Sequence, residues 1–409
     1  MIRKCLLISI AWFIAAGVIL ANPVRKTIQI GGFEREYLLY TPQHPLLEKA
    51  DGVIVCLHGF GRTMNDFFNE YNVSTVADSL NLIIAAPQAL PEQNPSVNLA
   101  AEAINSFTNN RISLNSVWGC GLSVRAYSKL LGINLLNEEL NRDVDDVNFI
   151  NTMIDDILSD YSLSSENLFI LGTSMGGYMA YQFALKKGEQ LSGLISIAGS
   201  MGLTIKGMDY ATKVPVCDFH SVTDEVVPYS GSQDQYLFTI SLAMAKSDVI
   251  KYWAETNTTG APVVEPVHYY PSTNGITVDK ITYPELVNEV IHYKINGASH
   301  GYFFRKENGD CMDHLEEIAR FIRRHFSGTS TQIPDMTAQK LFFYPNPVQN
   351  NIYFEARNGI VSIYEITGRK IFCQSFSSGQ IDLSFLKQGI YIIQVQSENA
   401  IRVNQFIKR

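Results

Sequence analysis

Six short apolar runs, rich in β-branched residues and too short for helices, most constrain the fold of this 409-residue chain. They are residues 53–57, 82–86, 168–171, 194–198, 214–219 and 290–295. Several show no alternation of apolar and polar side chains, which is typical of strands buried on both faces of a largely parallel sheet. Helical patterns with one apolar face lie between the runs, for example at residues 146–161, and another follows them at 315–326. Alternation of strands and helices predicts an α/β domain with a mostly parallel sheet flanked by helices.

Two changes of composition divide the chain after this domain. Residues 328–339 are rich in Ser, Thr and Gln, which predicts a polar linker. Residues 340–409 contain short, aromatic, alternating runs separated by Pro-Asn-Pro, Asn-Gly and Thr-Gly-Arg turns. This pattern predicts a small all-β, immunoglobulin-like sandwich. The α/β domain is therefore expected at residues 22–327.

The first 21 residues have the features of a secretory signal peptide. Arg3 and Lys4 precede the apolar run 6–20, and Ala21 is a small residue suited to cleavage. The run is shorter than the ~20 apolar residues that a membrane span needs. We therefore expect an exported protein whose mature chain has no transmembrane segment.

Charge and cysteine content exclude several classes of function. The formal net charge is −8, whereas a nucleic-acid-binding protein carries a basic surface. The scattered cysteines do not predict a disulfide scaffold or a zinc site, although a single disulfide between Cys120 and Cys311 is left open. The acidic residues of 143–160 lack the glycine of a calcium loop, and we expect them to cap a helix or face solvent. Neither a metal nor a cofactor is predicted.

Residues 172–176, Gly-Thr-Ser-Met-Gly, have the G-x-S-x-G pattern of a nucleophile elbow. They follow the expected strand 168–171 and open a helical pattern. Glycines beside the serine permit a sharp turn that lifts its Oγ clear of the backbone. This context favours Ser174 as a nucleophile over a serine in an ordinary tight turn.

A serine becomes a good nucleophile when a base accepts its proton and an acid orients that base. In this type of site the acid and then the base follow the serine along the chain, each just beyond a strand. Asp224 and His300 each follow one of the expected strands and occur in this order. We predict them as acid and base, with Asp218 and Glu225 as alternatives for the acid.

The negatively charged oxygen of the tetrahedral intermediate needs two backbone N–H donors. Met175, directly after the serine, is predicted to supply one, and Phe60, in the glycine-containing loop 57–62, to supply the other. His58 in the same loop is interpreted as a structural hydrogen-bonding group.

Residues 91–144 show no clear periodicity, and a stretch of this length predicts a functional loop or lid. Trp118 in this stretch is expected to contact substrate, with simple packing in the core as the alternative. Tyr178, just after the elbow, is the second residue expected to bind substrate.

Residues 26–327 resemble the secreted α/β-hydrolase esterases of the polyhydroxybutyrate depolymerase and feruloyl esterase type, which include carbohydrate esterase family 1. The resemblance rests on Leu-His-Gly at 57–59, Gly-Thr-Ser-Met-Gly-Gly-Tyr at 172–178, Thr-Asp-Glu-Val-Val-Pro at 223–228 and Ser-His-Gly at 299–301. It implies the α/β-hydrolase fold and a catalytic triad at Ser174, Asp224 and His300. The elbow departs from the family's usual Gly-Met-Ser-Asn-Gly, so feruloyl, acetyl and polyhydroxyalkanoate-like esters all remain candidate substrates.

Residues 341–409 resemble the C-terminal sorting domain of the type IX secretion system. The matching motifs are Tyr-Pro-Asn-Pro-Val at 344–348, Val-Ser-Ile-Tyr at 361–364, Thr-Gly-Arg at 367–369 and Leu-Lys-Gln-Gly-Ile-Tyr at 386–391, with Lys-Arg at the end. The resemblance implies the type IX machinery as a partner. It also implies export through the periplasm, followed by secretion or attachment at the cell surface.

The function predicted from these residues is a secreted serine carboxylic ester hydrolase that forms an acyl-enzyme. A serine peptidase of the prolyl oligopeptidase type shares the fold and triad, but it carries a large N-terminal propeller that this sequence does not show. An inactive surface-binding protein is the second alternative, and the ordered Ser, Asp and His set counts against it.

Overall fold

The computed structural model forms two compact units, Met1–Ser327 and Gly328–Arg409. It describes residues 22–42, 49–107, 112–128, 133–202, 212–231, 238–240, 243–257, 260–285, 288–327, 343–354, 359–365, 370–376, 379–397 and 400–409. The predicted signal peptide and the predicted linker lie outside these residues. Within the described ranges, every helix is too short or too polar to cross a membrane.

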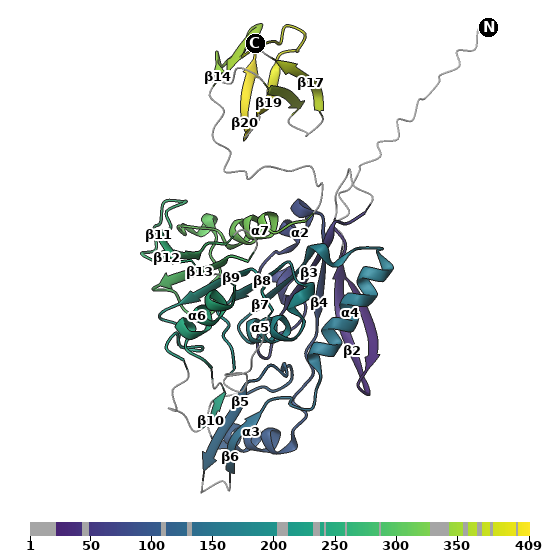
Figure 1. Cartoon of the computed structure of the whole chain (residues 1–409), viewed down its shortest axis with the longest axis vertical. Coiled ribbons are helices and arrows are strands. Elements are labelled where there is room, and N and C mark those ends of the chain that lie inside the picture. Colours follow the sequence, from purple (N-terminus) through teal and green to yellow (C-terminus); the bar gives the residue numbers. More distant parts are fainter. Residues whose placement is uncertain are drawn as a thin grey trace, which may run out of the picture. The chain divides into compact units, whose positions relative to one another are not determined.

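Ten strands of the larger unit form one sheet, in the order β1-β2-β4-β3-β7-β8-β9-β13-β12-β11 (Figure 1). The six predicted apolar runs form its central, parallel strands, while the two strands at each edge are antiparallel. The strands are β1 (Val24–Ile30), β2 (Phe33–Tyr40), β3 (Gly52–Leu57), β4 (Leu82–Pro87), β7 (Leu168–Thr173), β8 (Gly193–Ile197), β9 (Val216–Ser221), β11 (Val263–Pro266), β12 (Thr277–Tyr283) and β13 (Val290–Asn296). This confirms the predicted α/β-hydrolase fold.

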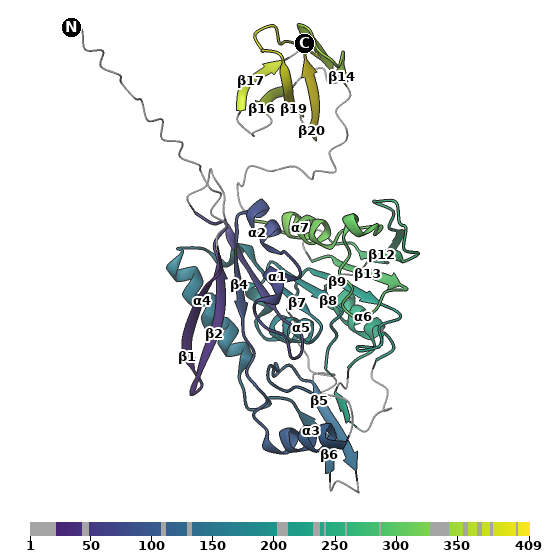
Figure 2. The ribbon, with the colours of Figure 1, turned by 180° about the vertical axis from the view of Figure 1, so that it is seen from behind.

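Hydrophobic cores cover both faces of this sheet. In β3, Val53 and Val55 face one core, whereas Ile54 and Cys56 face the other. The first core contains side chains of α3 (Pro95–Phe107), α4 (Asp146–Asp160), α5 (Met175–Lys187) and α6 (Lys246–Asn257). The second contains side chains of α1 (Asp66–Asn69), α2 (Ser74–Leu80) and α7 (His314–Arg324), which Figure 2 shows from behind. Burial on both faces explains why the strand sequences do not alternate.

The two predicted helices with apolar faces begin at aspartate caps. The Asp145 side chain accepts a hydrogen bond from the backbone N–H of Asn148 at the start of α4, and Asp313 caps α7 in the same way. Asp146 departs from the expectation that the acidic residues of this region face solvent. It is buried, forms an ion pair with Arg35 at 2.6 Å and accepts a hydrogen bond from the backbone N–H of Gly119.

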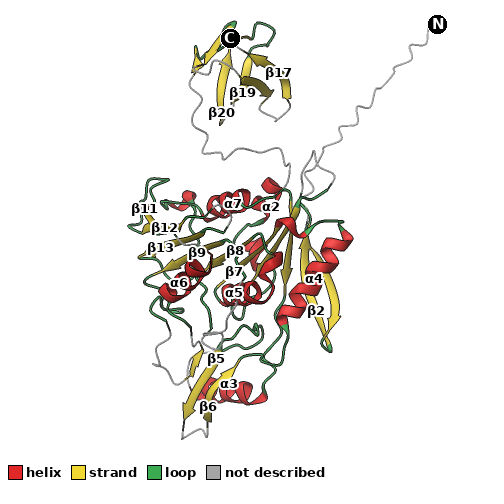
Figure 3. Cartoon of the chain, in the orientation of Figure 1, coloured by secondary structure: helices red, strands yellow, loops and turns green. Residues whose placement is uncertain are grey.

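Much of the stretch 91–144 is regular structure and not an irregular loop, which corrects the prediction. It contains α3 and the strands β5 (Ser123–Ser128) and β6 (Ile133–Glu139), which form a small sheet with β10 (Phe238–Ile240) in the order β10-β5-β6 (Figure 3). Ile104 of α3 and Val124 of β5 are buried in the same core as the main sheet. Burial of these apolar side chains stabilises the segment despite its polar composition.

Cys120 and Cys311, the pair for which a disulfide was left open, do not form one. Both thiols are free and buried. Cys120 belongs to the core on one face of the sheet and Cys311 to the core on the other, so the sheet separates them.

The smaller unit consists of β-strands in two sheets, in the orders β14-β15-β18 and β17-β16-β19-β20. Its strands are β14 (Phe343–Tyr344), β15 (Asn351–Phe354), β16 (Gly359–Glu365), β17 (Lys370–Phe376), β18 (Gln380–Asp382), β19 (Gly389–Ser397) and β20 (Ala400–Lys408). Val348, Ile352, Val361, Ile363 and Ile393 are among the buried side chains of its own core. The all-β character predicted for this region is confirmed.

Candidate active site

Ser174 lies in a strained turn between β7 and α5. Its backbone has φ 52° and ψ −120°, a combination that residues other than glycine rarely adopt. The turn requires close backbone contacts: a Cβ at Gly172 would lie 2.1 Å from the carbonyl oxygen of Gly176, and one at Gly176 would lie 1.9 Å from that of Leu57. The glycines of the G-x-S-x-G pattern therefore permit the turn that presents the serine hydroxyl.

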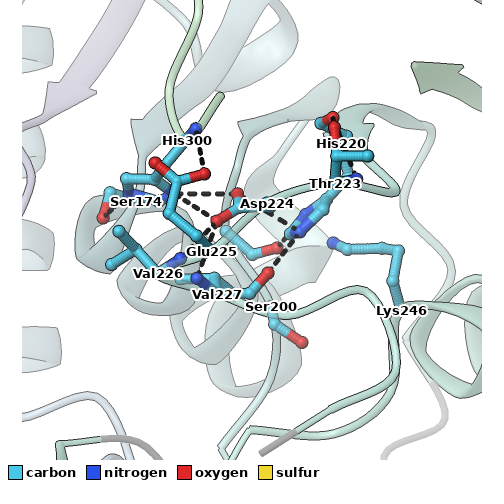
Figure 4. A network of polar contacts seen from close by, with 12 residues as sticks. Ser174, Ser200, His220, Thr223, Asp224, Glu225, Val226, Val227, Lys246 and His300 are labelled. Atoms are coloured by element: carbon cyan, nitrogen blue, oxygen red, sulfur yellow. Dashed lines mark hydrogen bonds and ion pairs between the residues drawn. The ribbon is translucent and has the colours of Figure 1, made fainter. Parts of the chain in front are cut away.

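The structure brings Ser174, His300 and Asp224 together in one hydrogen-bonded chain (Figure 4). The Ser174 Oγ is 2.9 Å from His300 Nε2, and His300 Nδ1 is 2.8 Å from Asp224 Oδ2. An ionised carboxylate only accepts hydrogen bonds, so Nδ1 carries the ring proton. The lone pair of Nε2 is then free to accept the hydrogen bond from the serine hydroxyl.

Asp224 is held by the loop that follows β9. Its side chain is fully buried, and Oδ1 accepts hydrogen bonds from the backbone N–H groups of Val226 and Val227 at 2.9 and 2.8 Å. Burial alone would raise the pKa of Asp224, but the hydrogen bond and charge of His300 and the bond from Val227 lower this pKa below its usual value. Asp224 is therefore ionised at neutral pH and fixes the orientation of the imidazole ring.

The two alternative acids do not contact the His300 ring. Asp218 is buried in a separate network, where it accepts hydrogen bonds from Lys246 Nζ at 2.7 Å, His292 Nδ1 at 2.9 Å and the hydroxyl of Tyr181 at 2.8 Å. Glu225 is exposed, and its carboxylate accepts a hydrogen bond from the backbone N–H of His300 at 3.3 Å.

His220 is a neighbour of the triad that the sequence analysis did not single out. Its Nε2 lies 2.8 Å from the carbonyl oxygen of Val227 and 3.6 Å from Asp224 Oδ2, and its Nδ1 lies 3.1 Å from the carbonyl oxygen of Gly199. Burial, helped by the charge of Lys246, lowers the pKa of His220 to about 4. A neutral imidazole has a single N–H, so in this form the ring donates to only one of the two carbonyl oxygens. The alternation of Asp218 and His220 in an otherwise apolar strand was the available signal, because it places both on one face.

The loop that contains Phe60 lies directly beside Ser174. A Cβ at Gly59 would be 3.3 Å from the Cβ of Ser174. Among the described residues, the backbone N–H groups of Phe60 and Met175 have no hydrogen-bond acceptor. His58 anchors this loop from the interior, since its Nδ1 contacts the carbonyl oxygen of Gly59 at 2.8 Å and its Nε2 accepts from the N–H of Ala89 at 3.1 Å.

Trp118 and Tyr178, the expected substrate-binding residues, both lie in the interior. Trp118 has no exposed surface, and its indole N–H donates to the carbonyl oxygen of His58 at 2.9 Å. Its ring centroid lies 5.0 Å from that of the His58 imidazole, so it supports the loop behind Phe60. Tyr178 is 1% exposed. Neither side chain has surface available to a substrate, which for Trp118 agrees with the packing alternative.

Comparisons of the sequence with known families found two matches. Residues 342–409 match the model of the secretion system C-terminal sorting domain. This domain marks a protein for secretion or cell-surface attachment. Residues 135–253 match the model of the phospholipase/carboxylesterase family. No curated protein sequence matches the chain significantly.

Several solved structures are similar to the larger unit at low sequence identity. An acetyl xylan esterase from Aspergillus awamori is 14% identical, with 73% of this chain and 99% of that chain covered and a TM-score of 0.45. The fluorophosphonate-binding serine hydrolase F of Staphylococcus aureus, in a substrate-bound form, is 13% identical, with coverages of 75% and 99% and a TM-score of 0.40. The S-formylglutathione hydrolase of the same organism is 13% identical, with the same coverages and a TM-score of 0.41.

The two family matches fall on different units of the chain. The match to the phospholipase/carboxylesterase family includes Ser174 and Asp224, and His300 lies beyond its end. The larger unit thus has an α/β-hydrolase fold with a carboxylesterase-like segment, and the smaller unit is similar to a secretion sorting domain.

Proposed function

We propose that the larger unit is a serine carboxylic ester hydrolase in which Ser174 is the nucleophile, His300 the general base and acid, and Asp224 the orienting acid. The observation that carries the proposal is the chain of hydrogen bonds from the Ser174 Oγ through the His300 ring to Asp224, which starts at a serine with a positive φ. The match of residues 135–253 to the phospholipase/carboxylesterase family supports the same conclusion.

The chemistry follows from which atoms carry protons. As the Ser174 Oγ attacks the ester carbonyl carbon, His300 Nε2 accepts the hydroxyl proton, and ionised Asp224 stabilises the resulting imidazolium. We assign the N–H groups of Phe60 and Met175 to the developing oxyanion, because both flank Ser174 and lack an acceptor. His300 then donates its proton to the departing alcohol, which leaves an acyl-enzyme that water hydrolyses by the same steps in reverse.

Feruloyl or acetyl esters of polysaccharides, or polyhydroxyalkanoate-like esters, are the proposed substrates. This finer assignment rests on the resemblance of the motifs around residues 57–59, 172–178, 223–228 and 299–301 to esterases of that type. The sorting-domain match supports a destination outside the cell or at its surface, and we propose the type IX secretion machinery as the route. Extracellular polymeric esters would be accessible there.

Initial rates on four substrates test the proposal and separate it from its alternatives. The substrates are 4-nitrophenyl acetate, methyl ferulate, a hydroxybutyrate oligomer and a proline-containing peptide anilide, each assayed with the full chain and with Ser174→Ala. The proposal predicts hydrolysis of at least one ester by the parent only. Cleavage of the anilide alone would indicate a peptidase, and inactivity on all four would favour the surface-binding protein.

A further inference from the structure

A second carboxylate lies beside the triad, on its solvent side. Glu225 follows Asp224 directly, but its side chain is exposed whereas that of Asp224 is fully buried. Its Oε2 accepts the hydrogen bond from the backbone N–H of His300 at 3.3 Å. Figure 4 shows the Glu225 side chain reaching toward His300, with its carboxylate at the same end of the site as Ser174.

The charge of Glu225 has no counter-ion among the described residues. Two described cations of this region are engaged elsewhere: Lys246 is buried against Asp218 at 2.7 Å, and Arg62 pairs with Asp66 and Glu70. Asp224, the other carboxylate of the site, is shielded by burial and by the His300 ring. Among the described residues, Glu225 is therefore an exposed and uncompensated negative charge directly beside His300.

We propose that Glu225 sets the charge specificity of this site, so that the enzyme disfavours esters with a negative charge close to the reacting carbonyl group and prefers neutral or cationic ones. The inference rests on the proposed function, and it narrows the substrate class to esters of neutral or cationic alcohols, such as uncharged sugars. A negative substrate charge roughly 7 Å from a solvent-exposed carboxylate is repelled enough to lower kcat/KM by about three- to tenfold.

The test compares three acetate esters of similar shape: 4-acetoxybenzoate, 4-acetoxybenzamide and (4-acetoxyphenyl)trimethylammonium. Glu225→Gln removes the charge and keeps an amide oxygen that can accept from the His300 N–H. The readout is the ratio of kcat/KM for the anionic ester to that for the neutral one, measured for the full chain and the variant, so that intrinsic reactivities of the esters cancel. We expect this anionic-to-neutral ratio, called the anionic ratio below, to rise about three- to tenfold in Glu225→Gln. The ratio of kcat/KM for the cationic ester to that for the neutral one should fall.

Glu265→Gln is the matched control. Glu265 is an exposed carboxylate on β11, which lies five strands from β7, the strand before Ser174, and three strands from β9, the strand before Glu225. At ~4.8 Å between strands these separations correspond to roughly 24 and 14 Å. The same change of net charge, made farther from the reacting ester, should change both ratios much less than Glu225→Gln does. A rise of equal size in Glu265→Gln would mean that net charge, and not Glu225, is responsible.

Ionic strength gives a second test that needs no variant. Raising NaCl from 0.02 to 0.5 M screens the repulsion, so the anionic ratio of the parent should increase while that of Glu225→Gln stays nearly constant. If the parent hydrolyses the neutral ester, but the ratios are the same in parent and variant and at both salt concentrations, then Glu225 does not set charge specificity. That result leaves the proposed esterase activity standing. A parent that hydrolyses none of the three esters overturns the proposed esterase.

Discussion

Replacing Asp224 by Asn tests the assignment of the orienting acid. An asparagine can keep its Oδ1 on the backbone N–H groups of Val226 and Val227, which places its Nδ2 donor against His300 Nδ1. The Nδ1 atom must then accept a hydrogen bond, and the ring proton moves to Nε2. In this tautomer Nε2 carries a hydrogen and points it at the Ser174 hydroxyl, so Nε2 has no lone pair with which to accept the serine proton.

The expected loss in kcat is roughly 10⁴-fold, the cost of holding a catalytic histidine in the wrong tautomer. This factor corresponds to about 5.4 kcal/mol of activation free energy. The fold should persist, because both backbone hydrogen bonds to the side chain are retained. Initial rates on the best ester of the panel, together with the melting temperature, measure the two effects separately.

Asp218→Asn is the matched comparison, because it makes the same chemical change at the alternative acid. It weakens the buried ion pair with Lys246, at a cost of up to about 3–5 kcal/mol in the free energy of unfolding. We therefore expect a clear drop in melting temperature and a much smaller loss in kcat than for Asp224→Asn. Near-normal rates for Asp224→Asn, with catalysis lost in Asp218→Asn, would refute the assignment.

Three further predictions follow from burial and domain organisation. Burial lowers the pKa of His58 and His220 to about 4 and of His314 to about 3, below the ordinary value of about 6.5. Unfolding then takes up protons below pH 6.5, so the free energy of unfolding should fall as the pH falls from 6 to 4, by at most about 1.4 kcal/mol per pH unit for each histidine. Urea titrations that show no such decrease would contradict this. Trp118→Ala should cost about 3–5 kcal/mol of stability and lower kcat/KM equally for aromatic and acetyl esters, and a selective loss on the aromatic ester would point to a substrate contact. A chain of residues 22–330 should keep the kcat/KM of the full chain, since no proposed site residue lies in the smaller unit, and a large loss would show that this unit contributes to the site.

The parts of the fold that the sequence predicts well are those with a strong local signal. The parallel strands are continuous apolar runs because both faces of the sheet are covered. Ser174, Asp224 and His300 stand out because each follows one of these strands among small or polar residues. The carboxyl ends of parallel strands meet at one edge, so chain order was enough to place the three together.

Other features depend on partners that are distant in the sequence. In the sequence, Asp146 is one of several acids at the start of a helix, and nothing marks its partner Arg35, which lies 111 residues away. The strands β5 and β6 are too short and too polar to be predicted from their own residues. The burial of Trp118 depends on how the surrounding segments pack, which the sequence does not show. His220 gives a weak signal, because its ring nitrogens contact backbone carbonyl oxygens that the sequence does not mark.

Covalent labelling of Ser174 tests the central claim most directly. The full chain is incubated with a fluorophosphonate, and its intact mass and the peptide that carries the label are determined by mass spectrometry, with Ser174→Ala as the control. We expect one adduct per full chain, located on Ser174, and loss of ester hydrolysis once it has formed. Ser174→Ala should carry no adduct. Labelling at another residue, or ester hydrolysis that survives in Ser174→Ala, would contradict the claim.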